Sequence, residues 1–355
     1  MNFLPIRSNH VETLEDPVAA DGDPCPKHHF EPRQLMAINA ALSANRPLLV
    51  RGEPGIGKTQ LARAAAKALR RAFVQCVVDA KTESRDLLWH FDAIGRLAEA
   101  QVLGALHVAC PPPAHPDGRD PAELALAALR QRLELKQFIH PRALWWAFDW
   151  PGAKTQADHV GVAPPPQTDN GDPRNGCVVL IDEIDKAESD VPNGLLEALG
   201  AGSFTPQGCH EPVKTVGVPP LVIITTNEER ALPDAFVRRC LVLHLKLPDQ
   251  RAELIAKLVE RGQTHFGAGV APKVLQAAAE MLADDRAAAE QRHWRPLPGQ
   301  AEYLDLVRGV VKQAGGDFEV QQALIAQVGQ FVLKKHPDAA REQDAGLTAL
   351  ENPPT

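Results

Sequence analysis

The fold is decided by the stretch Leu48-Leu49-Val50-Arg51-Gly52-Glu53-Pro54-Gly55-Ile56-Gly57-Lys58-Thr59. Its first residues form an apolar run typical of a buried strand, and a glycine-rich turn follows them. Residues 60–69, QLARAAAKAL, then have high helix propensity. Residues 52–59 match the pattern G-x-x-x-x-G-K-[ST], in the strand–loop–helix context that gives this pattern its meaning. The sequence therefore predicts a phosphate-binding loop between a strand and a helix.

Each part of this loop has a chemical role. Glycines let backbone N–H groups turn toward phosphate oxygens, and the N-terminus of the following helix adds partial positive charge. We expect Lys58 to reach the β- and γ-phosphates and the Thr59 hydroxyl to bind Mg²⁺. The residues expected to bind the nucleotide are Gly52, Glu53, Pro54, Gly55, Ile56, Gly57, Lys58, Thr59 and Gln60. A chance glycine-rich turn is the weaker interpretation, because strand, spacing and helix agree.

A second chemical signal lies in residues 177–183, CVVLIDE. Five apolar residues predict a buried central strand, and two carboxylates follow at its carboxyl end, where open α/β sheets bind ligands. We expect Asp182 to hold the hydration shell of Mg²⁺ and Glu183 to polarise the water that attacks the γ-phosphate. This acidic pair is a weak signal alone and a strong one beside the phosphate loop.

Length and composition set the broad class. The chain has 355 residues, of which 44% are apolar and 23% charged, as in a globular protein of two or three domains. Its net charge of −7 provides no overall basic field for nucleic acid, although a local basic pore is compatible with that total. No apolar run approaches the roughly 20 residues that span a bilayer, so we expect no membrane association and a cytoplasmic location.

Together these motifs resemble an AAA+ ATPase of the MoxR-like branch, which carries a helix-2 insert. Residues 52–59 match its Walker A element and residues 180–187, LIDEIDKA, its Walker B element. Residues 221–227, LVIITTN, look like its sensor-1 strand, where the Asn227 amide can orient the lytic water. Residues 229–240 resemble its arginine-finger segment, and the resemblance makes Arg238 and Arg239 candidates to reach a neighbouring subunit's γ-phosphate. Without the other motifs they would be interpreted as a solvated basic pair.

The resemblance implies an α/β fold, a P-loop NTPase sheet of parallel strands flanked by helices, with a C-terminal helical lid. We expect an N-terminal arm at 1–30, an ATPase core at 31–248, a lid at 249–336 and a flexible tail at 337–355. The core should contain insertions near 86–150 and an exposed loop at 151–176. Tryptophans in the insertion are predicted to pack it onto the core. Where the lid should carry a sensor-2 arginine the sequence has Gly299 and Gln300, and Arg295 is the nearest candidate to replace it.

The resemblance further implies ATP and Mg²⁺ as cofactors and an oligomeric ring, commonly a hexamer, whose sites are completed in trans. ATP hydrolysis would remodel or activate a protein client or a von Willebrand A-domain partner, as a chaperone does. One alternative is a nucleotide-dependent assembly or signalling switch of a bacterial conflict system. Another is a DNA-translocating or restriction-type motor, which the acidic net charge and the lack of a nucleic-acid-binding motif disfavour. An intact Glu183 does not separate the remodeller from the switch, because both can hydrolyse ATP.

Overall fold

The computed structural model describes residues 3–4, 10–14, 26–109, 121–334 and 336, so the predicted tail at 337–355 lies outside the described residues. The chain divides into two compact units. The first comprises residues 1–4, 37–49 and 65–242, and the second comprises residues 5–36, 50–64 and 243–355. The phosphate-loop segment thus belongs to the same unit as the C-terminal helices. Over the described residues, no helix combines the length and apolar character needed to cross a membrane.

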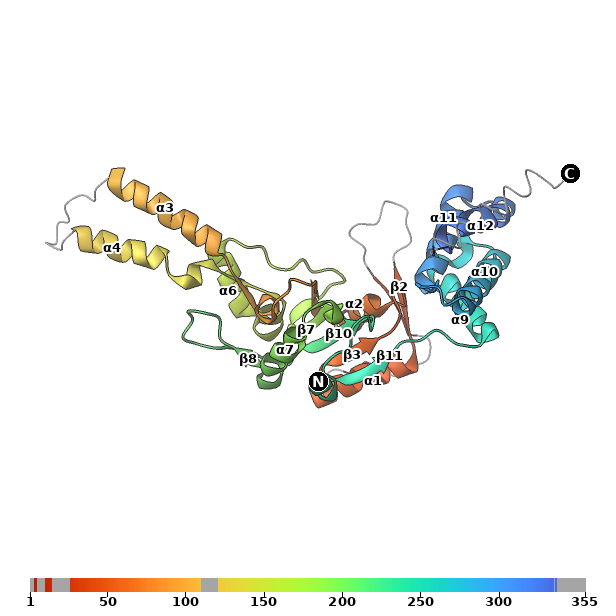
Figure 1. Cartoon of the computed structure of the whole chain (residues 1–355), viewed down its shortest axis with the longest axis horizontal. Helices are drawn as coiled ribbons and strands as arrows, with labels where there is room; N and C mark the ends of the chain where they lie inside the picture. The colour runs from red at the N-terminus through yellow and green to blue at the C-terminus, as the bar shows by residue number, and fades with distance from the viewer. Residues whose placement is uncertain (1–2, 5–9, 15–25, 110–120, 335, 337–355) are drawn as a thin grey trace. The chain divides into compact units, whose positions relative to one another are not determined.

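A central parallel sheet of five strands organises the fold, in the order β11-β3-β10-β7-β4 (Figure 1). Strand β7, which lies next to the edge strand β4, pairs in parallel with β10 and with β4, so that Val179 lies opposite both Val222 and Val74. Residues 178–181 are completely buried because both faces of this strand are covered. The strands are β3 (Leu48–Arg51), β4 (Arg71–Val77), β7 (Asp172–Asp182), β10 (Leu221–Thr226) and β11 (Leu241–His244). This confirms the predicted fold class.

The remaining elements that precede residue 243 surround the sheet or form the predicted insertion. The helices are α1 (Pro32–Ala44), α2 (Lys58–Leu69), α3 (Ala93–Ala109), α4 (Pro121–Arg132), α5 (Ala143–Phe148), α6 (Trp150–Val160), α7 (Asp190–Ala201) and α8 (Asp234–Arg239), with single-turn helices at Ser84–Leu87, Leu135–Phe138 and Ile184–Lys186. The short strands β5 (Trp89–Phe91) and β6 (Ile139–Pro141) pair with each other, as do β8 (Ser203–Phe204) and β9 (Val213–Lys214).

The insertion near 86–150 is fixed to the core by aromatic side chains. Trp145 and Trp146 are 6% and 3% exposed and belong to the same apolar cluster as the β7 residues. Trp145 packs edge-on against Phe204 with ring centroids 5.8 Å apart, and Trp146 against Trp150 at 5.0 Å. Such edge-to-face pairs add to the stabilisation from burial. The tryptophans therefore pack the insertion onto the core, as the sequence predicts.

The loop predicted at 151–176 is confined to residues 161–171, because the segment also contains helix α6 and the first residues of β7. The Asp149 carboxylate accepts a hydrogen bond from the Gly152 N–H and caps the helix, and proline is tolerated in a first helical turn. Ala153 and Ala157, one helical turn apart, are fully buried. Composition suggested a loop, but a capping residue and two small core-facing residues make a helix.

The N-terminal arm predicted at 1–30 is also wrong in its described part. Strand β1 (His10–Thr13) pairs antiparallel with β2 (Lys27–Phe30), and Phe30 is fully buried. Arg261 holds this hairpin, since its guanidinium donates to the His29 carbonyl at 2.8 Å and to Glu31 Oε1 at 3.0 Å. Side chains along β2 alternate between buried and half-buried, as in a strand with one face on the core. Four residues are too few for this alternation to be recognised in the sequence.

The C-terminal helices of the second unit form a small bundle with its own core, which agrees with the predicted C-terminal helical region. They are α9 (Arg251–Phe266), α10 (Pro272–Gln291), α11 (Gln300–Ala314) and α12 (Phe318–Val332), with a single turn at Gly267–Gly269. Leu258, Leu282 and Tyr303 are fully buried at its centre. A Cβ at Gly262 would lie 2.4 Å from the Tyr303 hydroxyl, so glycine is required there for the tyrosine to pack.

Candidate functional site

The phosphate loop has the shape that its motif predicts. It leaves β3 at Arg51 and enters α2 at Lys58, and Gly55 and Gly57 adopt φ angles of 75° and 95°, which favour glycine. The Lys58 ammonium is 7% exposed and donates hydrogen bonds to the carbonyl oxygens of Gly52 at 2.7 Å and Glu53 at 3.0 Å. The loop therefore curls around a cation at a helix N-terminus, and this donor set fits a bound polyphosphate.

The start of helix α11 lies against this loop. A Cβ at Gly55 would lie 2.7 Å from the Ala301 Cβ, and one at Gly57 would lie 4.0 Å from the Gln300 amide nitrogen. Gln300 thus brings a polar side chain of α11 close to the loop glycines. Arg295 is exposed and makes no hydrogen bond or ion pair with any described residue. Its role as a replacement for a sensor-2 arginine stays a prediction.

Glu53 of the phosphate loop forms a bidentate ion pair with Arg286 of α10. The Arg286 Nη1 and Nη2 atoms each lie 2.9 Å from one Glu53 carboxylate oxygen, and Nη1 also donates to the Pro298 carbonyl at 3.1 Å. Sequence reasoning missed Arg286, because 233 positions separate the partners and no local motif marks the arginine. The Glu53 carboxylate is consequently held by a helix of the bundle.

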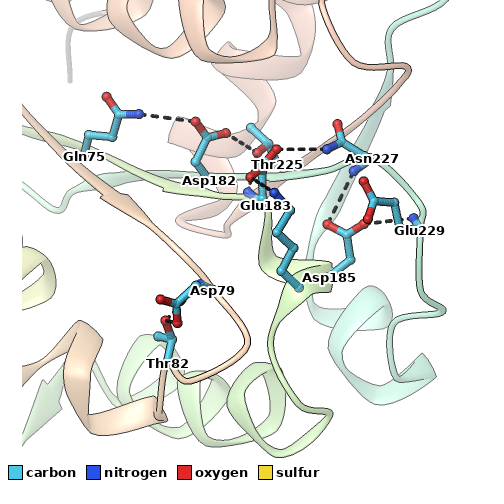
Figure 2. A network of polar contacts seen from close by, with 10 residues as sticks. Gln75, Asp79, Thr82, Asp182, Glu183, Asp185, Thr225, Asn227 and Glu229 are labelled. Carbon is cyan, nitrogen blue, oxygen red and sulfur yellow. Dashed lines mark hydrogen bonds and ion pairs between the residues drawn. The ribbon is translucent and has the colours of Figure 1, made fainter. Parts of the chain in front are cut away.

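The first unit contributes the acidic pair at the carboxyl end of β7 (Figure 2). The Thr225 hydroxyl of β10 donates to Asp182 Oδ1 at 2.5 Å, and the Gln75 amide of β4 donates to Asp182 Oδ2 at 3.2 Å. The Glu183 N–H donates to the same Thr225 hydroxyl oxygen at 2.9 Å. Side chains from both neighbouring strands therefore fix the position of the Asp182 carboxylate.

Glu183 and Asn227 are brought together, as Figure 2 shows. The Asn227 amide Nδ2 donates to Glu183 Oε1 at 3.1 Å, and the Lys186 ammonium donates to Glu183 Oε2 at 2.5 Å. Glu183 has a φ angle of 61°, which is uncommon for a residue with a side chain. The hydrogen bond to Glu183 raises the pKa of Lys186. Both carboxylate oxygens of the predicted general base are thus engaged by neighbouring donors.

Asp185 is a further residue of this network that sequence reasoning did not assign. Its side chain is buried, and its two oxygens accept hydrogen bonds from the backbone N–H groups of Glu229 at 2.9 Å and Asn227 at 3.4 Å. The contacts join the turn after β7 to the turn after β10, where Glu228 has a φ angle of 61°. Its position as a further acidic residue in the segment LIDEIDKA was the only sign of this role in the sequence. Asp185 therefore positions the segment that carries Asn227.

Arg238 and Arg239 lie in the last turn of α8 with exposed side chains. Their backbone is fixed by Arg46, whose guanidinium donates to the Arg238 carbonyl, to the Arg239 carbonyl at 3.0 Å and to the Cys240 carbonyl at 3.4 Å. These carbonyls end a helix and have no partner within it, so a cation is favourable there. The side chains of Arg238 and Arg239 make no hydrogen bond or ion pair with the described residues.

The predicted magnesium ligands are one hydroxyl and one carboxylate. No group of three or more His, Cys, Asp or Glu side chains that could hold a metal ion occurs among the described residues. Mg²⁺ usually keeps several waters and is held by one or two carboxylates together with substrate phosphates. The oxygen donors of Asp182 and Thr59 are therefore of the types that suit Mg²⁺ delivered with a nucleotide.

Comparison with known proteins gives a family. The model of the AAA domain (dynein-related subfamily) matches residues 47–240, more than half of the chain. No curated protein matches. Among solved structures, the chain is similar to a point mutant of Thermotoga maritima RuvB, with 14% identity and a TM-score of 0.40, over 83% of this chain and 67% of that chain. Because the matched residues run from before β3 to the end of α8, and so include the phosphate loop, the acidic pair and Asn227, the chain belongs to the dynein-related subfamily of the AAA domain family.

Proposed function

We propose that the protein is a MoxR-like, Mg²⁺-dependent ATPase that works as a ring oligomer and uses hydrolysis to remodel or activate a protein partner. One observation carries the catalytic part of this proposal. Glu183 follows Asp182 at the carboxyl end of β7 and is hydrogen-bonded to Asn227, which directly follows the neighbouring strand β10. A carboxylate general base held by an amide beside a metal-binding carboxylate suits attack of water on a phosphoanhydride.

The roles of the chain's residues follow from their chemistry. Backbone N–H groups of the phosphate loop, from residues other than Pro54, and the Lys58 ammonium bind phosphate oxygens, and the contacts of Lys58 with loop carbonyls give way to the nucleotide. Asp182 and Thr59 would hold Mg²⁺, which would supply positive charge beside the nucleotide phosphates. Glu183 accepts a proton from the attacking water, and Asn227 keeps the carboxylate oriented.

Exposure of the last turn of α8 supports the proposed ring. Arg238 and Arg239 have no partner among the described residues of their own chain, and a guanidinium supplied by a neighbouring subunit stabilises transition-state charge. In a ring, the α8 arginines of one subunit complete the site of the next. The number of subunits and the protein partner, including a von Willebrand A-domain protein, rest on the family resemblance. A cytoplasmic location is likewise proposed.

The test is steady-state ATP hydrolysis as a function of protein concentration, with mass photometry in the presence and absence of ATP. Specific activity should rise with concentration, and a ring should form with nucleotide. The Glu183→Gln variant should bind ATP, form the same ring and hydrolyse about 10²–10⁴ times more slowly, since it retains shape and loses the base. A monomer with concentration-independent activity, or wild-type turnover in the variant, would remove the proposal.

A nucleotide-dependent assembly or signalling switch is the second candidate. The observation that favours it is that both Glu183 oxygens accept hydrogen bonds, from Asn227 and Lys186, which limits the freedom of the base to engage water. A switch should form its ring with ATP and turn over slowly, and Lys186→Met should accelerate hydrolysis. A remodeller should instead hydrolyse ATP faster when its client is added. A DNA-translocating motor fits the acidic net charge less well.

A further inference from the structure

The first unit contains a cavity of about 510 Å³ that none of the roles above uses. Pro47 and Pro220, which line it, immediately precede β3 and β10, so the cavity lies where these adjacent strands begin. The phosphate loop and Asp182 follow the opposite, carboxyl ends of β3 and β7. The cavity is therefore not the predicted nucleotide site, and its volume falls within the range of small-ligand pockets, about 300–1,000 Å³.

The charge of the lining has one sign. Arg46 and Lys214 contribute two cations, and none of the described residues that line the cavity is acidic. The whole protein has a net charge of −7, so this cavity is locally positive in a protein that is negative overall. Focusing of a positive field in a concave site attracts anions.

Hydrogen-bond donors are also available in this lining. The side chains of Asn45, Ser203 and Lys214 make no hydrogen bond or ion pair with the described residues. Arg46 uses Nε and Nη2 to hold the end of α8, while its Nη1 has no partner in the described part of the chain. An anion in the cavity could accept hydrogen bonds from these groups without displacing any existing contact.

A third cation, Arg71, is buried next to a residue that lines the cavity. Arg71 is 3% exposed and donates from Nη1 to the carbonyl of Pro219, a lining residue, at 3.1 Å. No described carboxylate pairs with it, and burial lowers its pKa. A buried charge is costly unless a charge of opposite sign compensates it. An anion bound in the cavity would therefore supply negative charge close to Arg71 as well as to Arg46 and Lys214.

We propose that this cavity binds a small anion bearing phosphoryl groups, either an inorganic phosphate or a phosphate ester. Lys214 and Arg46 contact its oxygens, Ser203 and Asn45 donate further hydrogen bonds, and Arg71 contributes charge through the wall. Phe148 and Val222 give the cavity an apolar side, against which the organic part of an ester can pack. Because Arg46 also caps α8, the ligand touches a residue that positions Arg238 and Arg239.

The test is titration calorimetry with pyrophosphate as the probe, in Lys58→Ala protein so that the phosphate loop binds the probe only weakly. One saturable site should appear, and its affinity should fall as NaCl is raised. Adding Lys214→Met should weaken it about tenfold or more, the effect of losing a charge-assisted hydrogen bond. Lys214→Arg should keep it, and the matched control Lys154→Met, at an exposed position of α6, should leave it unchanged.

Competition then separates the two sources of the phosphoryl group. Displacement of pyrophosphate by glycerol phosphate at lower concentration than by inorganic phosphate would assign the site to phosphate esters, and the reverse order to free phosphate. Absence of saturable binding in Lys58→Ala protein, or equal weakening by Lys214→Met and Lys154→Met, would overturn the inference. Neither result bears on the proposed ATPase activity, because ATP binding to the phosphate loop is tested separately, by comparing wild-type protein with Lys58→Ala.

Discussion

Asp185 Oδ2 accepts a hydrogen bond from the backbone N–H of Glu229 at 2.9 Å, across 44 positions of sequence. The Asp185 side chain is buried, with 2% of its surface exposed. A buried carboxylate that accepts two backbone N–H groups ties together the turns that follow adjacent strands β7 and β10. Since Glu183 and Asn227 lie on these two turns, Asp185 determines the distance between the proposed base and the amide that holds it.

Replacing Asp185 by alanine should therefore lower both stability and hydrolysis. The Glu229 and Asn227 N–H groups would lose a charged acceptor, which costs about 1.5–3 kcal/mol for a hydrogen bond to a charged group. Urea unfolding measures this loss, with Asp158→Ala at an exposed position of α6 as the control, expected within about 0.5 kcal/mol of wild type. A stable Asp185→Ala protein with unchanged turnover would show that the two turns hold their geometry without it.

Lys58→Ala should weaken ATP binding by about 10–100-fold, because a charge-assisted hydrogen bond to phosphate contributes about 1.5–3 kcal/mol. Fluorescent-nucleotide titration measures the affinity, and Lys154→Ala serves as the control for removal of an exposed lysine. Equal affinity in wild type and Lys58→Ala would exclude the phosphate loop as the nucleotide site.

Mixing subunits should show whether the α8 arginines act in trans. Arg238→Ala or Arg239→Ala protein should be inactive or nearly so, by about 10³–10⁵-fold if the arginine stabilises the transition state, and Lys58→Ala protein should be inactive as well. A mixture should regain part of the wild-type rate, because an intact phosphate loop in one subunit can meet an intact arginine from the next. If neither arginine variant is rescued, the exposed pair has another role.

The bidentate pair between Glu53 and Arg286 should show measurable coupling. Glu53 is 42% exposed and Arg286 12%, so solvent screening limits the interaction to about 1 kcal/mol. A double-mutant cycle with Glu53→Gln and Arg286→Met in urea unfolding gives the coupling. The exposed pair Lys154 and Asp158 is the comparison, expected at about 0.3–0.5 kcal/mol. Coupling no larger than in that comparison would mean that the bidentate geometry adds nothing.

Two histidines, His28, which is buried, and His265, which is half-buried, should make the second unit sensitive to acid. Desolvation lowers the pKa of His28 to about 3 and that of His265 to about 4, from the usual 6.5. Because these histidine pKa values are lower in the folded protein, the unfolded chain binds more protons below about pH 6.5. The free energy of unfolding should therefore fall as the pH decreases below about 6.5. Above that pH these two histidines should not contribute to its pH dependence.

Urea unfolding at a series of pH values measures this dependence. His28→Asn should flatten the curve between about pH 4 and 6.5, whereas His159→Asn, at an exposed position, should leave its slope unchanged. Equal slopes in wild type and His28→Asn would show that His28 does not remain neutral in the folded protein.

The sequence by itself determined the local parts of this protein that rest on short-range chemistry. The pattern Gly52 to Thr59 specifies a turn that glycines at positive φ allow, and the apolar, β-branched runs at 178–181 and 221–224 favour buried strands. From these, the fold class, the acidic pair and Asn227 could be located. Helix α6 and the β1–β2 hairpin were missed, because a capping aspartate and four-residue strands are weak signals beside many prolines and glycines.

Only the tertiary structure decided which side chains meet. Asp185 reaches the backbone of the Asn227 segment, and Glu183 the Asn227 amide, because β7 and β10 are neighbours. Arg46 reaches the end of α8 across 193 positions, and Arg286 reaches Glu53 across 233. Hydrogen bonds and ion pairs depend on distances of about 3 Å, and packing of distant elements sets those distances, whereas strand, turn and helix depend on neighbours along the chain.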